Sequence, residues 1–354
     1  MRSHSFFSYA ALSVGFIALG APGGQAAPGY RVSGPFTHEN LSLYFVHGEA
    51  DKGPIPLTLE EALAKSRIRV DETSNVNELA IENLGDEEVF IQAGDIVKGG
   101  KQDRVLSVSL LVPGKSGRIP ISSFCVERGR WNPRGSEDAA RFSSSAASVS
   151  SRKSKMALHA PMPAADPRAS DPSGRRLYTM ETQVRQGEVW ADVERTQQKL
   201  SDRVGAPMAA GASRTSLQLS LENEKLADAK KPYLKALADA ARKEKDVVGL
   251  VFAVNGKINS GDVYPSHGLF EKMWSKLLNS SVTEAIGEKA SEAGTPPTTE
   301  QVLAFLDEAE KGKLSVRETA NVKVQTREAE RALYSEAARP SGGFAHRSYI
   351  YKTE

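Results

Sequence analysis

The sequence has a single cysteine, Cys125, in 354 residues, so the chain can form no internal disulfide. A protein without disulfides depends on its hydrophobic core for stability, and a chain of this length can bury one or two cores. The formal net charge is only +2, which gives no electrostatic reason to expect nucleic-acid binding.

Metal-binding and cofactor motifs are also missing. The histidines at positions 4, 38, 47, 159, 267 and 346 are scattered, without His-x-His, His-Glu-x-x-His or paired cysteines. Recognisable metal sites need such spacings, so we expect neither a metal ion nor a cofactor. The Gly-x-Ser-x-Gly nucleophile elbow and the protein-kinase motifs are absent as well.

The longest apolar stretch lies near the start of the chain, from Phe6 to Leu19. It follows Arg2, precedes the small residues Gly24 and Ala26, and is shorter than the roughly 20 residues that span a bilayer. Residues 1–26 are therefore predicted to be a cleavable signal peptide. The mature protein is expected to be exported to the periplasm or medium, with no further membrane span.

The pattern after the leader predicts an α+β fold. Short alternating segments and tight turns predict a mainly antiparallel β-rich N-terminal half, and helical spacing predicts a helix-rich C-terminal half packed on it. We place the main domain at residues 30–290 and a C-terminal extension of one helix plus strands at 291–354. Residues 132–176 are rich in Ser, Ala, Pro and Arg, which predicts a long flexible low-complexity insert.

The densest polar turn is KGGKQDR, which contains Lys98, Gly99, Gly100, Lys101, Asp103 and Arg104. Glycines allow close approach of the backbone to a ligand, and basic side chains suit an anion. The turn lacks the spacing of a phosphate-binding loop. An anion site and a plain glycine turn with solvated charges both fit these residues.

Two further segments contain candidate residues. CVERGRW places Cys125 and Glu127 on one face of a strand and Arg128 on the other, and Cys125 is more readily explained as a buried small residue than as a nucleophile. SGDVYPSHG places Asp262 and His267 at a strand-to-helix junction. They would suit an acid–base pair or a metal ion, although capping and turn formation explain them more simply.

Several segments together resemble a named family. They are ENLSLYFVHG, NLGDEEVFIQAGDIVKGGKQDRVLSVSLLVPG, FCVERGRW, RQGEVW and VFAVNGKINSGDVYPSHGLFEKMWSKLL, between about Glu39 and Leu278. The chain resembles the ARG and Rhodanese-Phosphatase-superfamily-associated protein domain family, found mainly in bacteria. The resemblance implies one α+β module without assigning a reaction or catalytic residues, and it is expected to end near Ala290.

Three hypotheses for function follow. The first is a non-enzymatic exported module of the cell envelope that binds a small anionic ligand or an envelope protein, with the ligand at the Lys98–Arg104 turn. The second is a hydrolase with a polar site built from that turn, Glu127, Arg128, Asp262 and His267. The third is a structural or assembly protein. Convergence of the turn, Glu127 and Asp262 in one pocket would favour the hydrolase or a ligand-binding site.

Overall fold

The computed structural model describes residues 29–73, 75–130, 141–161, 172–241, 245–289, 294–320 and 322–352, so the predicted signal peptide lies outside it. Helices combine with mostly antiparallel strands, which confirms the α+β class. No helix within these residues is long and apolar enough to cross a bilayer.

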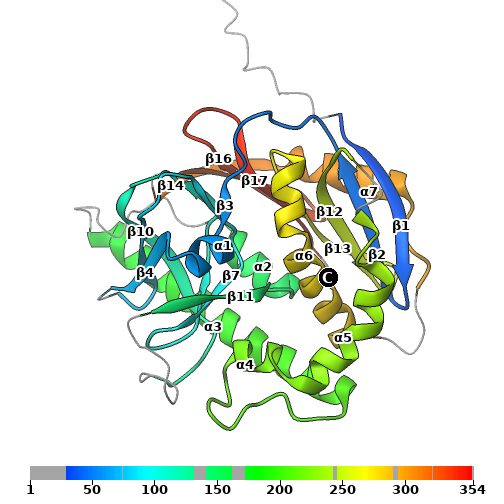
Figure 1. Cartoon of the computed structure of the whole chain (residues 1–354), viewed down its shortest axis with the longest axis horizontal. Helices are drawn as coiled ribbons and strands as arrows, with labels where there is room; N and C mark the ends of the chain where they lie inside the picture. Colours follow the sequence, from blue (N-terminus) through cyan, green and yellow to red (C-terminus); the bar gives the residue numbers. More distant parts are fainter. Residues whose placement is uncertain are drawn as a thin grey trace, which may run out of the picture.

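An eight-stranded antiparallel sheet, the large sheet, forms one side of the molecule (Figure 1). Its strands come from the beginning, the middle and the end of the described chain. In spatial order they are β1 (Arg31–His38), β2 (Leu41–His47), β12 (Val247–Val254), β13 (Lys257–Val263), β17 (Phe344–Tyr351), β16 (Ala332–Ala338), β15 (Val322–Glu328) and β14 (Lys313–Thr319).

Two smaller sheets form the opposite side. The six-stranded sheet has the order β11 (Phe142–Ser148), β7 (Asp95–Gly99), β8 (Arg104–Leu106), β10 (Gly117–Cys125), β5 (Glu78–Asn83) and β4 (Ile68–Glu72). The three-stranded sheet has the order β3 (Leu57–Thr58), β6 (Val89–Ile91) and β9 (Leu110–Val112).

Helices cover the large sheet and fill the space between the sheets (Figure 1). They are α1 (Leu59–Ala64), α2 (Arg152–His159), α3 (Pro172–Val204), α4 (Leu217–Leu221), α5 (Glu224–Leu237), α6 (His267–Gly287) and α7 (Thr299–Glu310). All eight residues of β12 are buried. Alternate side chains of a strand point to opposite faces, so Leu250 and Phe252 join the core that contains α6, whereas Val251 and Ala253 join the core that contains α7.

Several turns and helix starts have a clear local cause in the sequence. Asn255 and Gly256 have φ values of 52° and 74° and connect β12 to β13, as expected for an Asn-Gly hairpin. Ser266 caps α6 by accepting a hydrogen bond from the Leu269 backbone. Thr298 and Gln301 form a capping box at the start of α7.

The predicted split into a β-rich N-terminal half and a helix-rich C-terminal half is not confirmed. Four strands at the end of the chain, β14 to β17, complete the large sheet that β1 and β2 begin. Strand β17 pairs with β13, so residues after 290 are hydrogen-bonded into the sheet of the preceding domain. Long-range pairing of this kind leaves no mark on local hydropathy.

The serine-rich segment 132–176 also differs from the expected flexible loop, because it contains β11 and α2; residues 132–140 and 162–171 lie outside the described part of the chain. Strand β11 pairs with β7. In α2, Ser151 caps the first turn and the Ser154 hydroxyl donates to Asp192 Oδ2 at 2.6 Å. Polar contacts with distant residues, together with burial of Phe142, Val149 and Leu158 in the hydrophobic clusters, therefore order this segment.

Candidate functional site

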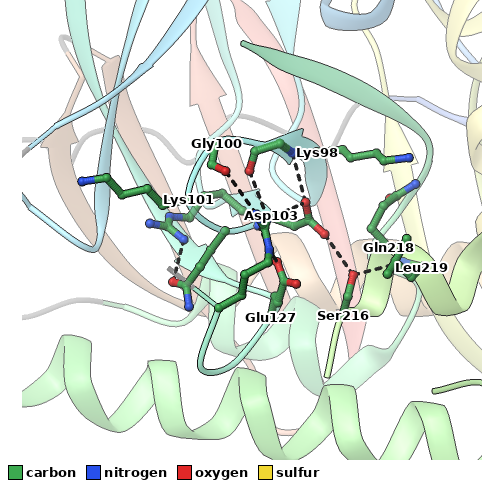
Figure 2. A network of polar contacts seen from close by, with 12 residues as sticks. Lys98, Gly100, Lys101, Asp103, Glu127, Ser216, Gln218 and Leu219 are labelled. Carbon is green, nitrogen blue, oxygen red and sulfur yellow. Dashed lines mark hydrogen bonds and ion pairs between the residues drawn. The ribbon is translucent and has the colours of Figure 1, made fainter. Parts of the chain in front are cut away.

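The KGGKQDR turn is a network of bonds between its own residues and neighbouring elements (Figure 2). Asp103 is fully buried, and its carboxylate accepts hydrogen bonds from the Gly99 backbone at 3.0 Å and the Ser216 hydroxyl at 2.9 Å. The Asp103 backbone donates to the Glu127 carboxylate at 3.2 Å. Arg130 donates to the same Glu127 oxygen at 2.7 Å.

The basic groups of the turn lie against carboxylates of the protein itself. The Arg104 side chain is 1% exposed and lies 3.4 Å from Glu72, and Lys98 donates to Glu222 at 2.9 Å. Lys101 is exposed, and its backbone N–H donates to Glu72. The predicted anion-binding side chains are thus gathered, but the charges of Lys98 and Arg104 are largely compensated internally.

The two glycines of the turn are required by the backbone. Gly99 has φ 125°, and a Cβ atom there would lie 2.5 Å from the Arg141 carbonyl oxygen. Gly100 has φ 55°, and a Cβ atom there would lie 2.3 Å from the Phe142 ring. Close packing against β11, rather than approach of a ligand, explains both residues.

The CVERGRW and RQGEVW segments hold each other in place. The Gln186 side-chain amide donates to the Cys125 carbonyl and accepts from the Cys125 N–H, both at 2.9 Å. Burial raises the pKa of the Cys125 thiol, so it is not an activated nucleophile. Arg128 is exposed, with its guanidinium over the Trp190 ring. Of the predicted site residues, Glu127 joins the turn network, whereas Arg128 lies at the surface.

Asp262 and His267 do not belong to the turn network, and each has its own bonding partners. His267 bonds to the Val247 carbonyl at 2.8 Å and lies 3.5 Å from Glu271 on the next turn of α6. These contacts fit a structural role at the helix start. Asp262 instead faces the partly buried Lys155 of α2 and the buried His346 of β17.

Asp262 belongs to a contact chain of three buried residues. His346 Nε2 lies 3.2 Å from Asp262 Oδ1, and His346 Nδ1 lies 3.0 Å from Ser109 Oγ. The exposed fractions of Ser109, His346 and Asp262 are 4%, 2% and 5%. The Ala93 N–H donates to Ser109 Oγ at 2.9 Å, which fixes the hydroxyl. We call these three residues, with Lys155, His159 and Arg317, the buried polar cluster.

The cations of the cluster control the ionisation of Asp262. Lys155 Nζ lies 3.6 Å from Asp262 Oδ2 and donates to Ser260 at 2.8 Å. Burial alone would raise the pKa of Asp262, but Lys155, His346 and His159 outweigh it and hold that pKa below its ordinary value. Burial, together with repulsion from His346, lowers the pKa of His159 to about 3. At neutral pH Asp262 is therefore ionised and His159 is neutral.

A cavity of about 10 Å³ adjoins the cluster and is lined by Ser107, Ser109, His159, Arg317 and His346, among others. Its volume is about that of one water molecule. Arg317, which is partly exposed, also lines a neighbouring cavity of about 20 Å³. Arg317 thus stands between these two cavities at the edge of the large sheet.

The large sheet carries a row of polar residues on its interior face beside this cluster. Asp262, Ser348, Ser335 and Thr326 are direct partners across β13, β17, β16 and β15, and all four are buried. Ser348 Oγ has no hydrogen-bond partner among the described residues. Unsatisfied polar groups in a core cost stability, and such sites often have a function.

Sequence reasoning found Asp262 but missed Ser109, Lys155, His159, Arg317 and His346. The available signals were weak: Ser107 and Ser109 interrupt an apolar run, and His346 alternates with Ser348 in a strand. Within the described chain, no group of three or more His, Cys, Asp or Glu side chains is arranged to hold a metal ion.

These features define an α+β protein with a Ser–His–Asp contact chain buried between its sheets. The chain belongs to the family described as the ARG and Rhodanese-Phosphatase-superfamily-associated Protein domain, which matches residues 29–350. The match extends well beyond the limit expected near Ala290 and includes His346. No curated protein and no solved structure shows a significant match.

Proposed function

We propose that this protein is a hydrolase in which Ser109 is the nucleophile, His346 the general base and Asp262 the residue that orients the base. The observation that supports this proposal is the contact chain from Ser109 Oγ through the His346 ring to Asp262. Of the residues in the hydrolase hypothesis from the sequence, the proposed site retains Asp262. It does not include the Lys98–Arg104 turn or Glu127, which bond to each other.

The positions of the charges determine the direction of proton transfer. His346 Nε2 lies 3.2 Å from ionised Asp262 but makes no hydrogen bond in the described structure, so a small rotation of the ring or the carboxylate is needed to place the ring proton between them and leave Nδ1 free to accept the Ser109 proton. Here Ser109 faces Nδ1 of the histidine ring, whereas the serine of the serine protease triad faces Nε2.

The reaction has two steps. Ser109 Oγ attacks the carbonyl carbon of an ester or amide while its proton moves to His346 Nδ1, and that proton then passes to the leaving group. Water next attacks the acyl group on Ser109, gives a proton to Nδ1 and restores the hydroxyl.

The cavity of about 10 Å³ beside Ser109 would hold the reacting atoms of the substrate. A whole substrate needs more room than this. Arg317 lies on β14, an edge strand of the large sheet, and is the partly exposed charged residue of the cluster that lines both cavities. Movement of Arg317 would connect the cavities and open a path to Ser109.

A fluorophosphonate probe should label Ser109, and Ser109→Ala should remove the label and lower ester hydrolysis by at least about a hundredfold. Asp262→Asn should slow labelling, because the His346 tautomer is no longer fixed. Arg317→Ala should speed labelling by opening the path. Mass spectrometry of the labelled peptide and hydrolysis of a small chromogenic ester are the measurements.

Ser107→Ala is the matched control, because Ser107 lines the same cavity but donates to the Ser122 carbonyl instead of His346. It should keep most of the labelling. If Ser109 remains unlabelled in both the wild type and a folded Arg317→Ala variant, the hydrolase proposal is wrong.

The second candidate is a non-enzymatic binding or accessory module of the cell envelope. The one-water volume of the cavity favours it, because no substrate fits beside Ser109 in this conformation. In that case the polar cluster would only stabilise the core, and the probe would label none of the variants.

We also propose that the chain is exported, which rests on the leader-like residues 1–26. A fusion of residues 1–30 to a reporter that is active only after export should give activity, and the reporter should be recovered cleaved after about residue 26. Replacing Leu12 and Phe16 by aspartate should abolish export, because it interrupts the apolar run. An uncleaved reporter kept in the cytoplasm would contradict the proposal.

A further inference from the structure

A larger cavity, of about 230 Å³, lies among α2, α3 and α6. Its lining includes Arg152 at the start of α2, Asp192 and Lys199 of α3, and Glu284 and Glu288 of α6. One water molecule needs about 10–15 Å³ of such space, so this cavity has ample room for a ligand the size of a small amino acid. None of the residues proposed for hydrolysis lines it.

Most charged groups of this cavity are already paired with one another. Arg195 donates to Asp192 Oδ1 at 3.1 Å, and the Lys199 ammonium forms an ion pair with Glu288. These pairs leave one carboxylate and one guanidinium of the lining, Glu284 and Arg152, without an ion-pair partner in the part of the chain that the structure describes.

Glu284 is the unusual residue. It is 8% exposed, and its carboxylate accepts one hydrogen bond in the described structure, from the Asn259 amide at 3.3 Å. Carboxylates are almost never this buried unless a cation accompanies them. Burial, then the charges of Glu288 and Asp192, raise the pKa of Glu284 to about 7, although Lys199 acts in the opposite direction. The Glu284 carboxylate therefore lacks an ion-pair partner within the described chain, although Lys199 is close enough to act on it electrostatically.

The end of the cavity formed by α2 is instead suited to a negatively charged group. Helix α2 begins at Arg152, and Ser151 Oγ accepts the Ser154 N–H, which leaves the N–H groups of Arg152 and Lys153 without partners inside the helix. These groups and the side chains of Arg152 and Lys153, which both line the cavity, favour an anion.

We infer that this cavity binds a small zwitterion of the amino-acid class, with its ammonium group against Glu284 and its carboxylate against Arg152 and the start of α2. The inference rests on the complementary pair of uncompensated charges across one cavity of suitable volume. It is independent of the proposed hydrolase site, so either one can fail without the other.

Isothermal titration of the mature protein with glycine, alanine, serine and threonine tests the inference. At least one should bind saturably, while methylammonium and acetate, which each carry one of the two charges, should bind at least about tenfold more weakly. Glu284→Gln and Arg152→Ala should each weaken binding by about tenfold or more, through opposite ends of the ligand. Glu271→Gln, on the exposed part of the same helix, is the matched control and should bind like the wild type.

The pH profile separates a bound ammonium group from a bound anion alone. Glu284 faces Asp192, Lys199 and Glu288, with Arg152, Lys153 and Arg195 also lining the cavity, and it must be ionised to hold an ammonium group. Affinity should fall about tenfold from pH 8 to pH 6, and this fall should be absent in Glu284→Gln.

Two results would overturn the inference. One is the absence of saturable binding of any of the four amino acids at millimolar concentrations. The other is acetate binding as tightly as alanine with no effect of Glu284→Gln, which would show a simple anion site. The tests on wild-type protein with the single-charge ligands do not depend on whether a variant folds.

Discussion

Arg130→Met should lower the free energy of unfolding by about 3–5 kcal/mol, because it leaves two fully buried carboxylates without this guanidinium. Arg130 donates to Glu127 at 2.7 Å and lies 3.6 Å from Asp103, and both carboxylates are 0% exposed. It also donates to the carbonyls of Gly99 and Gly100, so the variant loses contacts that hold the turn. Urea unfolding followed by circular dichroism gives the measurement.

Lys101→Ala is the matched control in the same turn. The Lys101 side chain is exposed, so its removal should change stability by less than about 0.5 kcal/mol. A loss below about 1 kcal/mol for Arg130→Met would show that the other contacts of Asp103 and Glu127 suffice. A large loss for Lys101→Ala would instead show that this side chain takes part in the network.

This comparison also bears on the first sequence hypothesis. If the turn bound an anion, adding phosphate or sulfate would stabilise the wild type more than Lys101→Ala. The geometry predicts equal stabilisation, because Lys98 and Arg104 already face carboxylates of the protein.

Local signals in the sequence were sufficient wherever one short segment determines the structure. Asn255-Gly256 predicts the β12–β13 hairpin because few residues tolerate its backbone angles. Ser266 and Thr298 predict helix starts because their hydroxyls bond to backbone groups three residues later. In each case the cause and the structure lie within a few residues.

The buried polar cluster could not be predicted in this way. Its residues lie at positions 109, 155, 159, 262, 317 and 346, and only strand pairing and the placement of α2 bring them together. A serine or histidine in a strand is unremarkable by itself, and Lys155 lies in a segment whose composition resembles a flexible loop. Composition shows what a segment can bury alone, whereas α2 is held by partners far away in the sequence.

Glu284→Gln should make the ligand-free protein more stable at pH 8, by up to about 3 kcal/mol, because an amide carries no charge to desolvate. The pKa of Glu284 is about 7 in the folded protein, above its ordinary value of 4.5. The folded state therefore keeps a proton that the unfolded state has lost between these pH values. Stability from the protonated form is fully present below about pH 4.5 and is lost as pH rises through 7.

The clearest measurement is the difference between wild type and Glu284→Gln as a function of pH. Relative to the variant, the wild type should lose about 2–3 kcal/mol of unfolding free energy between pH 5 and pH 8. Glu271→Gln should track the wild type, since Glu271 is exposed. A wild type more stable than Glu284→Gln at pH 8 would mean that a cation already compensates this carboxylate, and it would remove the reason to place an ammonium group there.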